Sequence, residues 1–215
     1  MSQTVELPPQ PSAWQLFTAF HSRAQRWPGA LRAALALFLP GAVALLTGHG
    51  SEMLLIAAGG CVVIYGEGHP YRSRLRVMAI AGLCLVAGVM SGSFVGSVVH
   101  SEIASGDSNL WLLLIALFTM ALATVGAFIQ NALRLPPPGS FFIVMVSGGT
   151  TMVARLGFNP VETAMWATVG VLSAIVIGMA PRLWNPHGPE MAAVQSLESA
   201  IEAMEKSDST SFAVH

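Results

Sequence analysis

The feature that most constrains this sequence is a series of long stretches without a charged residue. Val77–Val99 and Leu110–Leu133 are predominantly apolar and exceed the roughly 20 residues that a helix needs to cross a bilayer. A segment in lipid must satisfy its backbone hydrogen bonds internally, so such stretches favour membrane-spanning helices. Charged residues make up only 10% of the chain, against about 25% in soluble domains. We therefore expect an all-α fold, a polytopic membrane helix bundle.

Six charge-free stretches predict six transmembrane helices within a domain of residues 29–182. They are Ala33–Gly48, Met53–Gly66, Val77–Val99, Leu110–Leu133, Ser140–Ala154 and Thr163–Pro181. The second and the fifth are too short to span alone, and each carries a glycine pair, Gly59–Gly60 and Gly148–Gly149. Broken helices in matching halves are typical of a 3+3 inverted repeat with a transport site near the midplane.

The fifth stretch is the segment around which the other spans are expected to be arranged. Pro136–Pro138 end the incoming helix, and the apolar chain restarts near Gly139. The centre combines flexible backbone with hydroxyl groups at mid-depth, in Ser147, Gly148, Gly149, Thr150 and Thr151. Such backbone is tolerated in a membrane where protein covers it or where it lines a watery cavity. We predict that these residues, together with Gly59 and Gly60, line a substrate pathway; a tight helix contact is the alternative.

Basic residues predict the orientation, because nine of the ten fall on one side of a six-span arrangement. These nine are Arg23, Arg26, Arg32, Arg72, Arg74, Arg76, Arg134, Arg182 and Lys206. The positive-inside rule then places both termini in the cytoplasm, with Arg155 outside. Arg32 at the inner mouth and Arg155 at the outer end of the fifth span complete the predicted pathway, since fixed positive charge concentrates anions. Topogenic and snorkelling roles are the alternatives for these two arginines.

Small residues and the chain termini complete the predicted organisation. Small-residue stripes in the third and sixth spans predict central helix contacts, or a dimer face: Gly88, Gly92, Gly96, Gly170, Ala174 and Gly178. Residues 1–28 are expected to form a cytoplasmic segment with an interfacial helix between Trp14 and Trp27. Residues 183–215 are expected to form a short cytoplasmic tail, with an amphipathic helix over Glu190–Lys206 and a disordered end.

Three segments together resemble a known transporter family. They are the Leu31-Arg32-Ala33-Ala34 start of the first span, the arginine-rich loop after the second span, and the LPPPGSFF start of the fifth. They resemble the fusaric-acid-resistance family of aromatic acid exporters, which is similar in architecture to plant aluminium-activated malate channels. The resemblance covers about residues 28–206. It implies an organic-anion transporter or channel of the bacterial inner membrane, a dimer with a helical cytoplasmic region after the last span.

Chemical motifs favour transport over catalysis. The six histidines are scattered singly, and no catalytic triad, phosphate-binding loop or metal-ligand spacing occurs, so no enzyme, cofactor or metal is expected. No basic run with interleaved aromatic residues indicates nucleic acid. We predict a transporter or channel-like exporter of organic anions, with membrane lipid, a small organic anion and a second copy or another membrane protein as partners. The alternative is a non-transporting scaffold subunit of a cell-envelope assembly.

Overall fold

The computed structural model describes residues 27–132 and 139–186, and residues 188, 190, 191, 193–195, 197–201 and 204 of the C-terminal part. All regular secondary structure in these residues is helical, so the predicted all-α fold is confirmed. The expected interfacial helix before Trp27, the proline run Pro136–Pro138 and the end of the tail lie outside the described residues.

Each predicted apolar stretch forms a helical segment. The α-helices are α2 (Trp27–Leu46), α3 (Met53–Gly60), α4 (Tyr71–Ala104), α5 (Leu112–Ala132), α6 (Phe141–Thr150) and α7 (Pro160–Met179). Short 3-10 helices flank them: η1 (Gly50–Glu52), η2 (Cys61–Gly66), η3 (Asn109–Trp111), η4 (Val153–Leu156) and η5 (Ala180–Leu183). The described residues of the tail between 188 and 204 are helical.

Four helices are long and apolar enough to cross a membrane, and they involve α2, α4, α5 and α7. Their ranges are Trp27–Leu46, Tyr71–Ala104, Asn109–Ala132 and Pro160–Leu183. The second and fifth predicted spans form shorter apolar helices, Gly50–Gly66 and Phe141–Thr150. At 1.5 Å per residue, the 10 residues of α6 cover roughly 15 Å, about half of a hydrocarbon core. The structure therefore supports four spans of the six predicted.

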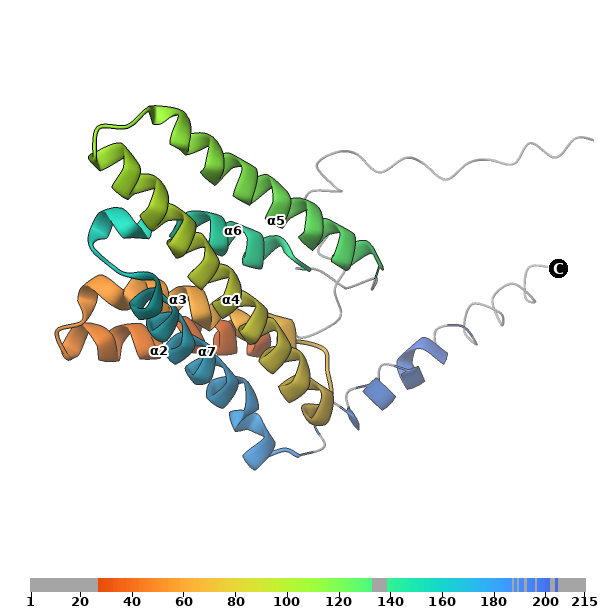
Figure 1. Cartoon of the computed structure of the whole chain (residues 1–215). Coiled ribbons are helices and arrows are strands. Elements are labelled where there is room, and N and C mark those ends of the chain that lie inside the picture. The colour runs from red at the N-terminus through yellow and green to blue at the C-terminus, as the bar shows by residue number, and fades with distance from the viewer. Residues whose placement is uncertain are drawn as a thin grey trace, which may run out of the picture.

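Helix α4 separates two groups of helices. Figure 1 shows α5 and α6 on one side of α4, and α2, α3 and α7 on the other. Helix α7 packs on α3 and α4, while α6 packs on α4 and α5. Val62, Met78, Leu85, Val89 and Ala167 belong to the buried core between these elements. Helices α4 and α7 are thus the central contacts, as their small-residue stripes predict.

Glycines make these central contacts possible because a side chain would collide with the opposing backbone. A Cβ atom added to Gly96 would meet the carbonyl oxygen of Thr151, on the segment that follows α6. A Cβ atom on Gly170 of α7 would similarly meet the carbonyl oxygen of Ile56 in α3. Both stripes are therefore used within one chain, and a dimer face on either of them would have to displace these contacts.

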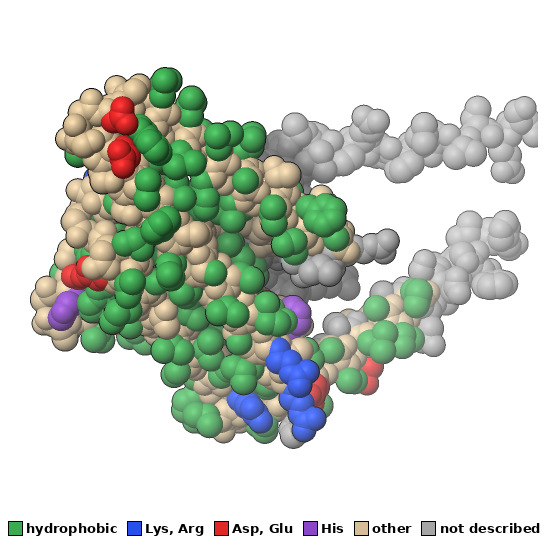
Figure 2. Space-filling view, in the orientation of Figure 1, with side chains coloured by type: hydrophobic (Ala, Val, Ile, Leu, Met, Phe, Trp, Pro, Cys, Tyr) green, Lys and Arg blue, Asp and Glu red, His purple; other side chains and the backbone are tan. Residues whose placement is uncertain are grey.

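Charge divides the bundle into two ends. The arginine end, where α2 and α4 begin and η2 and α7 finish, carries Arg32, Arg72, Arg74, Arg76 and Arg182. The opposite end, named the cavity end here for two hollows described below, carries Arg155. Figure 2 shows blue arginine side chains gathered at one end of the visible face. The described basic residues are thus segregated as the sequence predicts.

Candidate functional site

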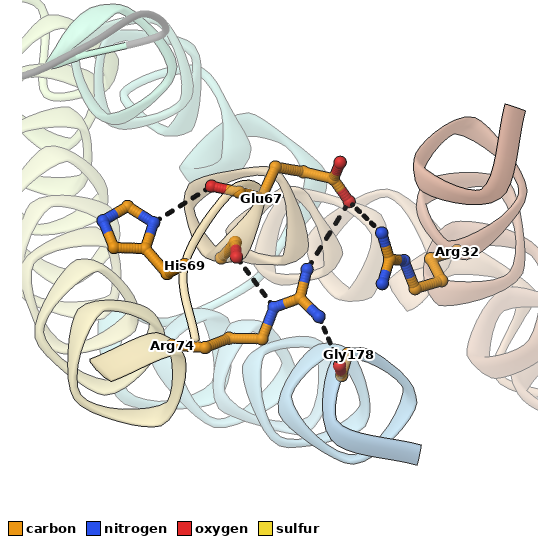
Figure 3. Close-up of polar contacts among 6 residues, drawn as sticks. Arg32, Glu67, His69, Arg74 and Gly178 are labelled. Carbon is orange, nitrogen blue, oxygen red and sulfur yellow. Dashed lines mark hydrogen bonds and ion pairs between the residues drawn. The ribbon is translucent and has the colours of Figure 1, made fainter. Parts of the chain in front are cut away.

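Two arginines share one carboxylate at the arginine end. Arg32 Nη2 donates a hydrogen bond to Glu67 Oε1 at 3.0 Å, and Arg74 Nη2 lies 3.7 Å from the same oxygen (Figure 3). Two guanidinium groups are always protonated in proteins, whereas one carboxylate supplies a single negative charge. The three side chains, called the arginine cluster below, therefore carry an excess of positive charge.

Arg74 is the fixed member of the arginine cluster. It is 3% exposed, and its Nε donates to the carbonyl oxygen of Gly66 at 2.7 Å. Its Nη1 donates to the carbonyl oxygen of Gly178 at 3.3 Å, and its Cζ lies 5.8 Å from the ring centroid of Tyr71. Helices leave their last carbonyl groups without intrahelical donors, and these groups carry partial negative charge. Arg74 therefore ties the ends of η2 and α7 to the first turn of α4.

Arg32 and Glu67 are the accessible members of the cluster. Their side chains are 23% and 43% exposed. The Nε atom of Arg32 is buried and has no hydrogen-bond partner in the part of the chain that the structure describes. A Cβ atom on Gly29 would collide with the Glu67 carboxylate, so that glycine makes room for it. Arg32 consequently has one buried donor without a partner among the described residues.

The predicted pathway segment in α6 forms a helix contact. Ser147, Thr150 and Thr151 are buried, and Thr150 Oγ1 lies within hydrogen-bond distance of the carbonyl oxygens of Val89 and Ser147, at 3.2 and 2.8 Å. Across the helix, a Cβ atom on Gly149 would meet nothing within 4 Å. A Cβ atom on Gly148 would lie 3.5 Å from Thr119. This arrangement is the one expected for a tight helix contact, the alternative to a pathway. A substrate pathway through the segment stays a prediction.

The second glycine pair lies in a different helix contact. A Cβ atom on Gly59 would meet the carbonyl oxygen of Ala167 in α7, while one on Gly60 would lie 3.0 Å from that of Ala36 in α2. Both glycines are buried. The pairs Gly59–Gly60 and Gly148–Gly149 are thus placed among different partners, so the midplane site expected from an inverted repeat is not evident in this conformation.

Two hollows lie at the cavity end. The larger cavity, of about 520 Å³, is lined by Ser51, Glu52, Leu156, Gly157, Phe158 and Glu162. The smaller cavity, of about 380 Å³, is lined by Ser97, His100, Ser101, Ala154, Gly157, Phe158, Asn159 and Pro160. Beside the smaller cavity, Arg155 Nε donates to His100 Nδ1 at 3.3 Å.

Sequence reasoning identified some of these functional candidates and missed others. It selected Arg32 and Arg155, but it selected neither Glu67 nor His100. It also placed Arg74 in a loop, whereas α4 begins at Tyr71 and buries that arginine. Pro70 directly before α4 was the available signal, because proline is common where a helix starts.

Comparison with known proteins supports a membrane protein and assigns no family. The chain is 26% identical over 189 residues to the "Uncharacterized membrane protein YvaC" of Bacillus subtilis (strain 168), an alignment that covers 85% of this chain. It covers 27% of that relative, so the chain spans about a quarter of the relative's length. No family model and no solved structure matches the chain. Together with its four candidate spans, this similarity identifies a multi-pass helical membrane protein with a bacterial homologue.

Proposed function

We propose that this chain forms a transporter or channel-like exporter of organic anions in the bacterial inner membrane. The observation that carries the proposal is the arginine cluster, in which Arg32 and Arg74 share the single carboxylate of Glu67. Excess positive charge at one end of a membrane bundle raises the local concentration of anions. The partial exposure of Arg32 and Glu67 leaves the cluster open to a ligand.

Glu67 occupies the place that the substrate carboxylate would take. A carboxylate can accept two parallel hydrogen bonds from one guanidinium group, and such pairs are among the strongest in proteins. Arg32 donates to Glu67 through Nη2 alone, and its Nε is unpaired among the described residues. An incoming carboxylate would exchange with Glu67 at Arg32, while Arg74 stays fixed by its carbonyl partners. Replacing one carboxylate by another leaves the net charge of the site unchanged.

Topology and fold complete this proposal. The positive-inside rule places the arginine end in the cytoplasm, the side from which an exporter takes its substrate. In this arrangement α3 with η2 and α6 are the two short members of a six-segment bundle with inverted halves. The resemblance to the fusaric-acid-resistance exporters supports the choice of substrate. Since the chain spans about a quarter of its relative, we propose that a second copy or a further membrane segment completes the transporter.

Flux measurements in liposomes test the proposed function. Efflux of radiolabelled benzoate is compared for the wild-type protein, Glu67→Gln and Arg32→Gln. A hydrogen bond to a charged group contributes about 1.5–3 kcal/mol, so Arg32→Gln should weaken the apparent affinity about tenfold or more. Glu67→Gln removes the internal competitor and should strengthen it.

Arg182→Gln is the matched control for these flux measurements. Arg182 is an exposed arginine at the same end but lies outside the arginine cluster. It should leave the affinity unchanged. Benzoate efflux no faster than from protein-free liposomes would contradict the transport proposal.

A non-transporting scaffold is the second candidate, and one observation favours it. The described helical residues of the tail expose an apolar stripe, formed by Met191, Val194, Leu197, Ile201 and Met204. An exposed stripe of this kind is typical of a helix that binds a partner. A stable co-purifying membrane protein together with the absence of benzoate flux would support this candidate over transport.

A further inference from the structure

We propose that the smaller cavity at the cavity end is a second carboxylate-binding site. It is an open hollow of about 380 Å³, formed by the end of α4, by η4 and by the start of α7. The identity of the ligand rests on the proposed function, because the site would hold the transported anion at the end opposite the arginine cluster. The site itself is argued from its own side chains.

The contact between Arg155 and His100 determines which atoms donate hydrogen bonds in this site. Arginine has donors only, so His100 Nδ1 must accept the bond from Arg155 Nε. A neutral imidazole with Nδ1 as acceptor carries its proton on Nε2. That Nε2 atom is buried and has no hydrogen-bond partner in the described ranges. Because solvent does not reach this atom, a ligand in the smaller cavity has to be held by other donors.

One further donor lines the smaller cavity, and others lie beside it on Arg155. Within the described part of the chain, the terminal guanidinium nitrogens of Arg155 make no hydrogen bond or ion pair. Asn159 Oδ1 accepts from the backbone N–H of Glu162 at 2.8 Å, which leaves the Asn159 amide nitrogen as a donor. No carboxylate lines the cavity, so nothing anionic in its wall competes for these donors.

The neighbouring cavity provides an internal comparison. The larger cavity shares Gly157 and Phe158 with the smaller one, yet its polar lining includes the carboxylates of Glu52 and Glu162 and no cationic side chain. Like charges repel, so an anion arriving at this end of the bundle is favoured in the smaller cavity only. Gly157 has φ 89°, a left-handed conformation that favours glycine, and it turns the chain between the two hollows.

The composition of the wall defines the class of ligand. Ala154, Phe158 and Pro160 supply apolar surface to the wall, which also contains Asn159. Arg155 lies beside the wall through its contact with His100. Ligand sites commonly combine such an apolar lining with a few polar groups that fix orientation. The smaller cavity therefore suits a monocarboxylate with a small apolar body, with its carboxylate directed to Arg155.

Thiol protection in the full-length protein tests this site without measuring transport. In a Cys61→Ala/Cys84→Ala background, Ser101→Cys places a thiol in the lining of the smaller cavity, and Ser51→Cys places one in the larger cavity. Each purified protein reacts with methyl methanethiosulfonate in detergent, with benzoate or with its neutral analogue benzamide. We expect benzoate to slow modification of Ser101→Cys at least fivefold, and benzamide to have no effect. Modification of Ser51→Cys should not change.

The arginine variants then assign the protection to its cause. Arg155→Gln should abolish protection of Ser101→Cys by benzoate, whereas Arg182→Gln should preserve it. Protection that persists in Arg155→Gln, or equal protection by benzamide, would overturn the proposal. If the thiol does not react even without benzoate, equilibrium dialysis of radiolabelled benzoate decides, and equal binding by wild type and Arg155→Gln overturns the proposal.

The two proposals fail in distinguishable ways. Protection without benzoate flux would leave a carboxylate site in a protein that does not transport. Flux without protection would leave the transporter and remove this second site.

Discussion

The two ends of the bundle use the same type of residue for opposite purposes. At the arginine end, Arg74 is 3% exposed and donates to two backbone carbonyl groups. At the cavity end, Arg155 is exposed, and its one side-chain hydrogen bond among the described residues goes to His100. One arginine is therefore a structural tie, and the other has free donors beside a cavity.

The helix ends that these residues serve differ. At the arginine end η2 and α7 finish, and their last carbonyl groups need external donors, which Arg74 provides. At the cavity end α7 begins, and Asn159 caps it by accepting from the N–H of Glu162, while Pro160 occupies the first turn and has no N–H to satisfy. The start of α7 therefore needs no donor or acceptor from an arginine.

The largest expected effect on stability follows from removing the Arg74 side chain at the arginine end. Arg74→Met leaves the carbonyl groups of Gly66 and Gly178 without their donor in a buried setting. Each unpaired buried group costs about 1–3 kcal/mol, so we expect the free energy of unfolding to fall by about 3 kcal/mol or more. Thermal or denaturant unfolding in detergent measures this change.

Arg76→Met is the matched control for that experiment. Arg76 lies two residues after Arg74 in α4 but is exposed. A substitution at such a position usually changes the free energy of unfolding by no more than about 0.5 kcal/mol. Equal loss of stability in both variants would show that charge at this end matters, and that the bonds of Arg74 to the helix ends do not.

A smaller effect is expected at the centre, where the helices meet closely. Gly96→Ala places a methyl group against the carbonyl oxygen of Thr151, and overpacking of this kind costs typically about 1–3 kcal/mol. Gly149→Ala puts the same group into open space on the far side of α6, and removing a helical glycine there should stabilise by up to about 1 kcal/mol. The difference between the two melting temperatures in detergent is the measurement, and a destabilised Gly149→Ala would contradict the described packing.

Sequence patterns predicted the helices because a charge-free stretch is a local property. They misplaced the start of α4, since the charges at Arg72, Arg74 and Arg76 were assigned to a loop, although Tyr71 already begins the helix. They identified the fifth segment as special but could not decide between a pathway and a helix contact. That decision depends on Gly92 and Gly96 of α4, which approach the backbone of the fifth segment only in the folded bundle.

The partners in the candidate sites could not be predicted, because they are distant in sequence. Arg32 and Glu67 are 35 positions apart, and Arg155 and His100 are 55 apart. No local periodicity relates such pairs. The bias of basic residues towards one side identified Arg32 and Arg155 as candidates, whereas the carboxylate and the imidazole that they contact required the arrangement of helices in space.

The smallest expected effect concerns Asp107, which lies in the turn between α4 and α5 at the cavity end, outside the candidate spans. Trp111 Nε1 donates to Asp107 Oδ2 at 2.8 Å, and the N–H of Ser108 donates to Oδ1 at 2.9 Å. Both bonds favour the ionised carboxylate, so the indole first and then the backbone N–H lower the pKa of Asp107 below its usual range. A carboxyl group whose pKa is lower in the folded state stabilises the fold above its unfolded pKa, about 3.9, and this contribution disappears as pH falls through the folded value. The carboxylate is fully exposed, so solvent screens the effect and keeps it small.

Trp111→Phe should raise the pKa of Asp107 towards its usual range, as measured by carboxyl carbon-13 NMR of the protein in micelles. Trp166→Phe, which removes an indole beside His49 instead, is the control and should leave that pKa unchanged. An unaltered pKa in Trp111→Phe would mean that the indole does not hold this carboxylate.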